Sequence, residues 1–405
     1  MVRIIGCQSA ALSSVYICNV ILMLLIARCY AVVDESMDAA FLSPNHIYTP
    51  SSSQMVVTTR MKTWITCVTS VGIAMASSAY YNYRFNERCD VPWIHQDPDA
   101  VRKSLNIEWK KRVFGQDLAL KVIRNMLVSH LKRVAVGKSK KPLVMSFHGG
   151  IGTGKTFVST LLANVLYRKG ENSSFVRRLH LVDMLSNSKT IDQKRNLIKN
   201  EIRTIVQLCS RALIIFDEVD KLEEGVIDVL FPYFDEQQSV GNINFRNTIF
   251  IFSSNVGARK INHEACIQFN KTDQSSQFDT ERFYHIVRQA SYDGLESHQS
   301  SSESLRGGFA TAKFIKHCLV NSFVPFLPLQ MNHVLKCMDA SIAERDDIMK
   351  ILKHKPALKS KFFSFILPKI SKVSPPGCTK VFSVNGCKRV TSLFDQEMDS
   401  FFYSD

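Results

Sequence analysis

A glycine-rich turn between two apolar runs constrains the fold of this 405-residue chain more than any other feature. Residues 149–156, GGIGTGKT, match the phosphate-binding pattern G-x-x-x-x-G-K-[S/T]. The run before them, LVMSFH, is strand-like, and the run after them, FVSTLLANVLY, is helix-like. This order places backbone N–H groups and a helix N-terminus around a phosphate. The alternative is a glycine turn that binds nothing, and both flanks argue against it.

The loop predicts a nucleotide site with ATP and Mg²⁺ as cofactors. Lys155 is placed to reach the β- and γ-phosphates, and the Thr156 hydroxyl is placed to ligate Mg²⁺. The residues expected to contact the nucleotide are Gly149, Gly150, Ile151, Gly152, Thr153, Gly154, Lys155 and Thr156, together with Asp217.

Two further apolar runs, ALIIFDEVDK and NTIFIFSSN, end in polar residues. Continuously apolar runs are typical of parallel strands buried on both faces, and ligand groups lie at the carboxyl ends of such strands. Asp217 can therefore join the Mg²⁺ shell, and Glu218 can polarise the attacking water. Asn255 can hydrogen-bond the γ-phosphate or the water. The alternative for Asp217 and Glu218 is that they are two surface acids after a core strand. The alternative for Asn255 is that it only caps a strand.

Helical spacing of apolar residues extends over residues 104–136, with a break at 114–116. We expect a second strand and a turn within 180–187, a charged helix over 192–208, and a helix that ends at Pro232. Together these elements predict an α/β fold with a parallel sheet.

The N-terminus predicts entry into a lumen. Residues 1–31 have a charged start, an apolar central run and small residues at their end, as a cleaved signal peptide has around its cleavage site. The alternative is an uncleaved membrane anchor. Residues 32–60 are expected to be a polar linker. The apolar segment 61–88 is expected to make a shallow membrane contact, with a buried helix as the alternative.

Cysteine content supports the same compartment, whereas the net charge bears on possible partners such as an anionic membrane face. The formal net charge of +15 comes from lysines and arginines scattered along the chain, which favours a basic surface over a nucleic-acid site. Eleven cysteines are more typical of a lumenal protein than of a cytosolic enzyme. Asn172 and Asn270 lie in glycosylation sequons, although such sequons are common by chance.

Six sequence segments, taken in chain order, resemble the torsin branch of the AAA+ ATPases of the Clp/Hsp100 type. The segments are RVFGQDLALKVI, KKPLVMSFHGGIGTGKTFVS, ALIIFDEVDKLEEGVIDVLFPYFD, NTIFIFSSNVGARKI, NSFVPFLPL and VFSVNGCKRVTSLFD. The resemblance implies a three-layer α/β large domain over 89–309, with a Ser-rich loop at 291–308. It also implies a small C-terminal helical domain over 310–405.

The resemblance assigns roles to matching residues. Lys155 and Thr156 take the Walker A positions, Asp217 and Glu218 take Walker B, and Asn255 takes sensor 1. Gly386-Cys387-Lys388 matches the sensor-2 word, where Lys388 would contact the γ-phosphate. The resemblance also suggests two disulfides, Cys337 with Cys387 and Cys89 with Cys209, with buried thiols as the alternative.

Two departures from related families bear on activity. Torsins usually have Asn after the loop lysine, and Thr156 restores a hydroxyl that can ligate Mg²⁺. Clp-type unfoldases have an arginine finger in a word that reads FVPFLPL at 323–329 here, without an arginine. The motif of a threading pore loop is also missing. As in torsins, this implies weak ATP hydrolysis until a membrane-anchored cofactor with a lumenal domain supplies the arginine.

The sequence therefore predicts an ATPase of the endoplasmic reticulum lumen, including the perinuclear space, that remodels protein or membrane complexes. Self-assembly or a mixed ring and peripheral membrane contact are expected. The alternatives are an ATP-gated scaffold with little turnover and, from the net charge alone, a nucleic-acid loader.

Overall fold

The computed structural model describes residues 97–187, 190–236, 240–272, 275–293, 312–352 and 355–402. The chain divides into two compact units, 1–88 and 89–405. The predicted signal peptide, polar linker and apolar segment lie outside the described residues, as do Cys89 and 294–308 of the Ser-rich loop. Within the described ranges, no helix has the length and apolar character needed to cross a bilayer.

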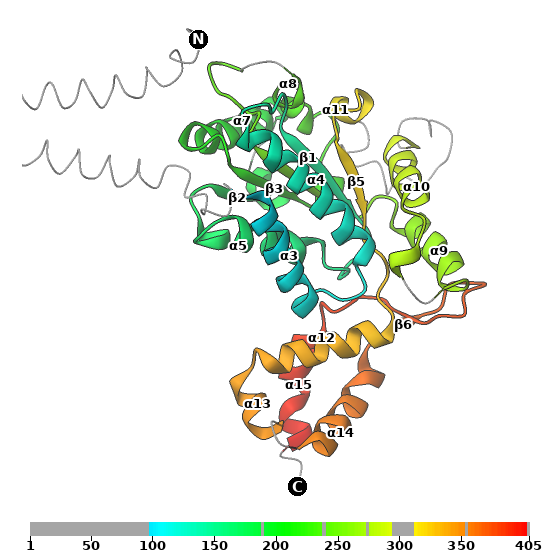
Figure 1. Cartoon of the computed structure of the whole chain (residues 1–405). Helices are drawn as coiled ribbons and strands as arrows, with labels where there is room; N and C mark the ends of the chain where they lie inside the picture. The colour runs from blue at the N-terminus through cyan, green and yellow to red at the C-terminus, as the bar shows by residue number, and fades with distance from the viewer. Residues whose placement is uncertain are drawn as a thin grey trace, which may run out of the picture. The chain divides into compact units, whose positions relative to one another are not determined.

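A five-stranded parallel sheet forms the centre of the second unit (Figure 1). The strand order is β2-β3-β4-β1-β5, and every neighbouring pair is parallel. The strands are β1 (Leu143–His148), β2 (Val176–His180), β3 (Leu213–Asp217), β4 (Ile249–Ser254) and β5 (Ser322–Pro325). β1, β3 and β4 are buried along their whole length, as their apolar sequences predicted.

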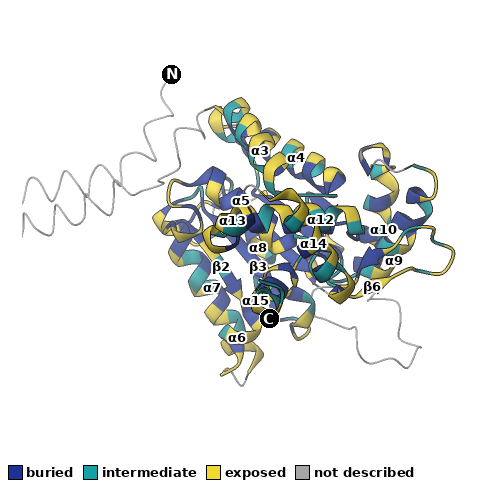
Figure 2. Cartoon of the chain, turned by 90° about the horizontal axis from the view of Figure 1, so that it is seen from below, coloured by how far each residue is buried: buried dark blue, intermediate teal, exposed yellow. Residues whose placement is uncertain are grey.

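Helices cover both faces of this sheet. α3 (Pro98–Arg112), α4 (Asp117–Ala135) and α5 (Lys155–Leu166) share a core with Met145 and Phe147 of β1. α7 (Ile191–Leu208), α9 (Ala258–Phe269) and α10 (Thr280–Asp293) share the other core with Val144 of the same strand. Successive strand residues point to opposite faces, so the three-layer α/β prediction is confirmed. Figure 2 shows exposed residues on the outward faces of α3 and α4.

Two local predictions were wrong. The second strand is 176–180, and the residues after it form α6 (Leu181–Leu185). β2 is an edge strand, so it tolerates two arginines that weakened its sequence signal. Pro232 lies in the first turn of α8 (Phe231–Phe234) and does not end a helix. Its fixed φ and missing N–H suit that position.

The small helical part follows β5. Residues 322–325 form β5, hydrogen-bonded to β1, and apolar residues within 312–327 pack in the cores of the large domain. α12 (Met331–Ala343), α13 (Asp346–Leu352), α14 (Pro356–Ile366) and α15 (Val390–Phe402) then gather around their own apolar core, at the lower end of Figure 1. β6 (Lys372–Val373) and β7 (Phe382–Ser383) pair as an antiparallel hairpin, which we call the 372–383 hairpin.

The remaining elements are short. They are η2 (Gly170–Asn172), η3 (Val219–Lys221), η4 (Ile227–Leu230), η5 (Ser275–Gln277), α11 (Lys313–Lys316) and η6 (Leu367–Lys369).

Candidate nucleotide-binding site

A cavity of about 480 Å³ lies at the carboxyl ends of β1, β3 and β4 and extends to α12 and the loop after β7. Its volume is in the range of small-molecule sites. The predicted residues that line it are Ile151, Gly152, Thr153, Gly154, Lys155, Thr156, Asp217, Glu218, Asn255 and Lys388. Residues separated by more than two hundred positions thus meet at one site.

Lys155 begins α5 and is almost fully buried. Its Nζ donates hydrogen bonds to the carbonyls of Gly149 (2.7 Å) and Gly150 (2.8 Å) and to Asn255 Oδ1 (3.0 Å). Burial lowers the pKa of Lys155 to about 8, although the nearby carboxylates oppose this shift. The ammonium is therefore mainly charged at pH 7 and is held at the loop by oxygens that an anionic phosphate can replace.

Asp217 is the last residue of β3 and is buried. Its Oδ2 accepts a hydrogen bond from Arg178 Nη1 (2.8 Å), whereas Oδ1 is buried without a partner in the described part of the chain. A buried carboxylate oxygen without a donor is costly unless a cation or water satisfies it. Together with the Thr156 hydroxyl in the same cavity, this oxygen fits the hard oxygen ligands that Mg²⁺ prefers.

Arg178 on β2 is a site residue that our sequence analysis missed. Besides Asp217, its guanidinium donates to Ser159 Oγ (3.1 Å), Thr160 Oγ1 (3.0 Å) and Glu171 Oε1. Its side chain is 14% exposed. Arg178 thus fixes the orientation of Asp217 and links β2 and β3 to α5. The sequence carries no clear signal for this role, because Arg178 lies in a strand that also carries Arg177 and His180.

Asp220 was also missed, although it is the third acid of the DEVD word. Its carboxylate accepts from the backbone N–H of Asn255 (3.1 Å) and from Asn255 Nδ2 (3.4 Å). These contacts turn Asn255 Oδ1 toward Lys155. Asp220 therefore sets the orientation of the predicted sensor-1 amide without lining the cavity itself.

Glu218 lines the cavity with an unusual backbone. Its φ is +56°, a left-handed conformation that is uncommon for a residue with a side chain. Its carboxylate is about half exposed and accepts a hydrogen bond from Lys221 Nζ (2.7 Å), which raises the pKa of Lys221. Lys221 thus engages one of the two carboxylate oxygens of Glu218, and the half-exposed side chain also lines the cavity.

Gln116 fixes the phosphate loop from behind. The side chain is buried, and its Nε2 donates to the carbonyls of Thr153 (3.0 Å) and Leu327 (2.8 Å). Its Oε1 accepts from the N–H of Leu327 (2.9 Å). The amide thereby joins the loop to the segment after β5. The sequence showed only a break between two helices here.

Lys388 reaches the cavity from the loop after β7. Gly386 of that loop packs directly on Gly152, and a Cβ on Gly152 would lie 1.8 Å from the carbonyl oxygen of Asn385. Both glycines have positive φ, +73° for Gly152 and +52° for Gly386. Only glycine combines this conformation with this close approach. The N–H of Cys387 also donates to the carbonyl of Gly152 (3.3 Å).

Disulfides hold this loop. Cys337 on α12 is joined to Cys387, as the sequence analysis predicted, and both line the cavity. A second disulfide, Cys266 with Cys378, was not predicted. The proposed partner of Cys209, Cys89, lies outside the described residues, so that pairing stays a prediction.

The segment 322–329, where an arginine finger would be expected in a Clp-type unfoldase, is buried throughout. Phe323 and Leu327 belong to one sheet core, and Val324 and Phe326 belong to the other. The segment therefore contributes to the large domain core and contains no arginine.

Comparisons with known proteins identify the family that the chain is similar to. A family model described as Torsin matches residues 83–216. A torsin-like protein of Caenorhabditis elegans is 30% identical over 330 residues, which cover 80% of this chain and 86% of that protein. A torsin-like protein of Drosophila melanogaster is 32% identical over 326 residues, covering 78% of this chain and 87% of that protein.

Among solved structures, the chain is similar to S. cerevisiae Hsp104 in its ADP complex, with a TM-score of 0.48 and 17% identity. A closed-state reconstruction of Hsp104 with ATPγS and casein gives a TM-score of 0.45 and 16% identity. These matches cover 75% and 74% of this chain, which spans about half of the length of each Hsp104 chain.

Proposed function

Because the chain belongs to the torsin family of AAA+ ATPases, we propose that it binds and hydrolyses ATP in the lumen of the endoplasmic reticulum, including the perinuclear space. There it would remodel protein or membrane complexes in a chaperone-like role. The predicted signal peptide and the sequon at Asn172 support this compartment.

Each residue of the cavity has a different proposed role in ATP binding and hydrolysis. Lys155 exchanges its loop carbonyls for phosphate oxygens, and the loop N–H groups and the start of α5 face the same anion. Thr156 and Asp217 would hold Mg²⁺, which supplies positive charge at the phosphates when bound. Glu218 orients the attacking water, and Asn255 and Lys388 contact the γ-phosphate end. Thr156 supports turnover because it offers a hydroxyl ligand.

The observation that carries the proposal is the lack of a finger arginine in the buried segment 322–329. An arginine that stabilises the transition-state charge is worth about 10³ to 10⁵ in rate in other NTPases. We therefore propose that a membrane-anchored partner with a lumenal domain donates it, within a self-assembled or mixed ring.

ATP turnover by the purified full-length chain tests this dependence. We expect near-background hydrolysis by the chain alone and stimulation by the lumenal domain of a membrane-anchored partner. The same domain with its arginine changed to alanine is the matched control and should bind without stimulation. Brisk turnover by the chain alone would refute the proposal. Lys155→Ala removes the phosphate-facing ammonium, and its rate of ATP hydrolysis defines the background of the assay.

The alternative is an ATP-gated scaffold with little turnover. One oxygen of the Glu218 carboxylate accepts a hydrogen bond from Lys221, so only the other is free of that ion pair in this conformation. Glu218→Gln should trap ATP in either case. A scaffold would keep its cellular role with this change, whereas a remodelling ATPase would lose it.

A further inference from the structure

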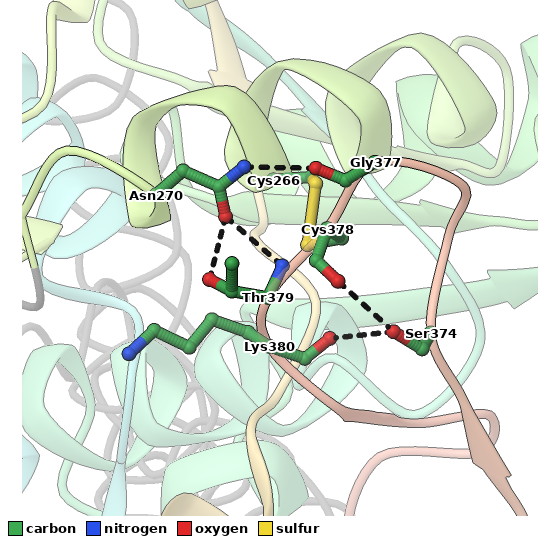
Figure 3. Close-up of a disulfide and its surroundings, with 7 residues drawn as sticks. All are labelled: Cys266, Asn270, Ser374, Gly377, Cys378, Thr379 and Lys380. Atoms are coloured by element: carbon green, nitrogen blue, oxygen red, sulfur yellow. Dashed lines mark hydrogen bonds between the residues drawn. A yellow bond between two sulfur atoms is a disulfide. The ribbon is translucent and has the colours of Figure 1, made fainter.

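The last turn of α9 grips the 372–383 hairpin at three points, two of which Figure 3 shows. Cys266 is joined to Cys378 by a disulfide. The Asn270 side chain bonds the turn next to that disulfide. Phe269 lies between Cys266 and Asn270 in the sequence and contacts Phe382, with ring centroids 5.8 Å apart.

The Asn270 amide uses both of its ends in this contact (Figure 3). Nδ2 donates to the carbonyl of Gly377 (2.9 Å). Oδ1 accepts from the N–H of Thr379 (3.1 Å) and from Thr379 Oγ1 (2.7 Å). A single side chain at the end of α9 therefore holds both sides of the turn residue Cys378.

The disulfide and the turn reinforce each other. Cys266 is buried on α9, and its Cα lies 5.4 Å from that of Cys378. Ser374 Oγ lies within hydrogen-bonding distance of the carbonyls of Cys378 (3.3 Å) and Lys380 (3.2 Å), which braces the turn from within. The turn is thus presented to α9 as an ordered unit.

Contacts continue from the hairpin to the phosphate loop. Phe382 is buried in the core of the large domain, and the N–H of Ser383 donates to the carbonyl of Leu329 (2.8 Å). Ser383 Oγ then donates to the carbonyl of Gly386 (2.9 Å), and Gly386 packs on Gly152. Lys388 follows directly in the cavity wall. The grip of α9 on the hairpin therefore contributes to the position of Lys388, together with the adjacent Cys337–Cys387 disulfide.

We propose that Asn270 and the Cys266–Cys378 disulfide form a clamp that positions Lys388 over the phosphate loop, and that N-glycosylation of Asn270 is incompatible with the closed clamp. Neither Asn270 nor Cys266 lines the cavity, so both act as positioning residues. The proposal rests on the proposed role of Lys388 at the γ-phosphate.

The incompatibility follows from the chemistry of the sequon Asn270-Lys271-Thr272. A glycan replaces one of the two hydrogens of Nδ2, which lies 2.9 Å from the carbonyl of Gly377, so the bulk of its first sugar would have to fit beside the turn that the closed clamp holds. The sequon threonine is also engaged, because Thr272 Oγ1 donates to Gln277 Oε1 (2.9 Å). Both sequon asparagines are exposed, but only Asn270 lies at the turn that the clamp holds, whereas Asn172 lies in η2, which packs with α5 and β2. Glycan occupancy is therefore expected at Asn172.

Nucleotide titration of the full-length chain tests the positioning role. Asn270→Ala, and separately the double change Cys266→Ser with Cys378→Ser, should weaken binding of a fluorescent ATP analogue about fivefold, the scale of one net hydrogen bond. ADP-analogue affinity should stay within about twofold, because the γ-phosphate contact is the one displaced. Asn270→Asp keeps the acceptor for Thr379 and should lose less. Asn172→Ala and Cys318→Ser are the matched controls and should change neither affinity.

Lys388→Ala separates the two ways in which this test can fail. If it weakens ATP and not ADP while the clamp variants change neither, or change both equally, the clamp proposal is wrong. If Lys388→Ala does not distinguish ATP from ADP, the proposed sensor role fails, and the clamp proposal fails with it.

Non-reducing peptide mapping of the chain from secretory cells tests the modification. In the unaltered chain, peptides linked through Cys266 and Cys378 should contain unmodified Asn270. In the double serine variant, occupancy at Asn270 should rise because the hairpin docks less firmly. A glycan on Asn270 within the disulfide-linked peptides, or equal occupancy in the two chains, would overturn the incompatibility.

Discussion

The two sides of the cavity are built in different ways. On the sheet side, each functional residue lies at or next to the end of a parallel strand: the phosphate loop follows His148, Asp217 ends β3, and Asn255 follows Ser254. On the opposite side, Lys388 lies in a loop held by contacts between distant segments. These are the pairs Cys266–Cys378, Cys337–Cys387 and Phe269–Phe382.

This difference teaches that the two sides respond to different kinds of change. The sheet side is fixed by strand pairing and by buried polar groups, so unpairing a charge there should destabilise the large domain. The Lys388 side is fixed by a few tertiary links, so losing one link should displace the loop. The following substitutions test each side, in order of expected effect.

Phe382→Ala should have the largest effect on the Lys388 side. Phe382 is 1% exposed and packs in the large domain core although it follows the helix α14 of the small part. Deleting a buried phenylalanine costs about 3 to 5 kcal/mol of unfolding free energy. Val381→Ala, at a position 44% exposed, is the control and should cost less than about 0.5 kcal/mol. Urea unfolding measures the loss of unfolding free energy in both variants. Equal losses would contradict the idea that Phe382 anchors the hairpin to the large domain.

Arg178→Ala should destabilise the sheet side by about 3 kcal/mol, because it leaves the buried Asp217 carboxylate without its cationic partner. Arg177→Ala, one position earlier on β2, removes an exposed ion pair with Glu201 and should cost less than about 1 kcal/mol. Thermal unfolding compares the two variants. Mg²⁺ should restore part of the stability lost in Arg178→Ala, and equal melting temperatures in the two variants would contradict the assigned role.

Gly152→Ala tests the point where the two sides meet. The new Cβ would strike the carbonyl of Asn385, so the variant should lose about 2 kcal/mol of unfolding free energy beyond the cost of its positive φ. Gly137→Ala has a similar φ of +66° with no atom within 4 Å of the added Cβ, and it measures that conformational cost alone. Identical losses in the two variants would mean that the loops do not depend on this close approach.

The pH dependence of stability should report on His148 at the end of β1. Its Nδ1 lies 3.1 Å from the carbonyl of Val256, to which it donates, and its Nε2 lies 2.6 Å from Ser146 Oγ, from which a neutral ring accepts. Burial lowers the pKa of His148 to about 4. The folded state therefore binds fewer protons than the unfolded chain between pH 4 and about 6.5.

The stability that this neutral ring contributes is fully present above pH 6.5 and is lost as the pH falls toward 4. About 1 kcal/mol should disappear between pH 7.5 and 5.5. Denaturant unfolding at several pH values measures this slope, with His148→Gln as the reference. A slope that is the same in the variant would show that another group is responsible.

The sequence by itself determined the sheet side. The glycine loop, the acids after ALIIF and the asparagine after FIFSS were readable because buried parallel strands are continuously apolar and their functional groups follow within a residue or two. The pairing of Cys337 with Cys387 came from the family resemblance, since spacing cannot pair cysteines.

Only the tertiary structure decided the rest. Arg178, Asp220 and Gln116 have no local signature, because their roles depend on partners brought near by strand order and loop packing. β5 spans only four residues and was not recognised from its sequence, because its place in the sheet depends on its pairing with β1. The Cys266–Cys378 clamp joins segments 112 positions apart, and such contacts are set by the packed fold and not by the pattern of either segment.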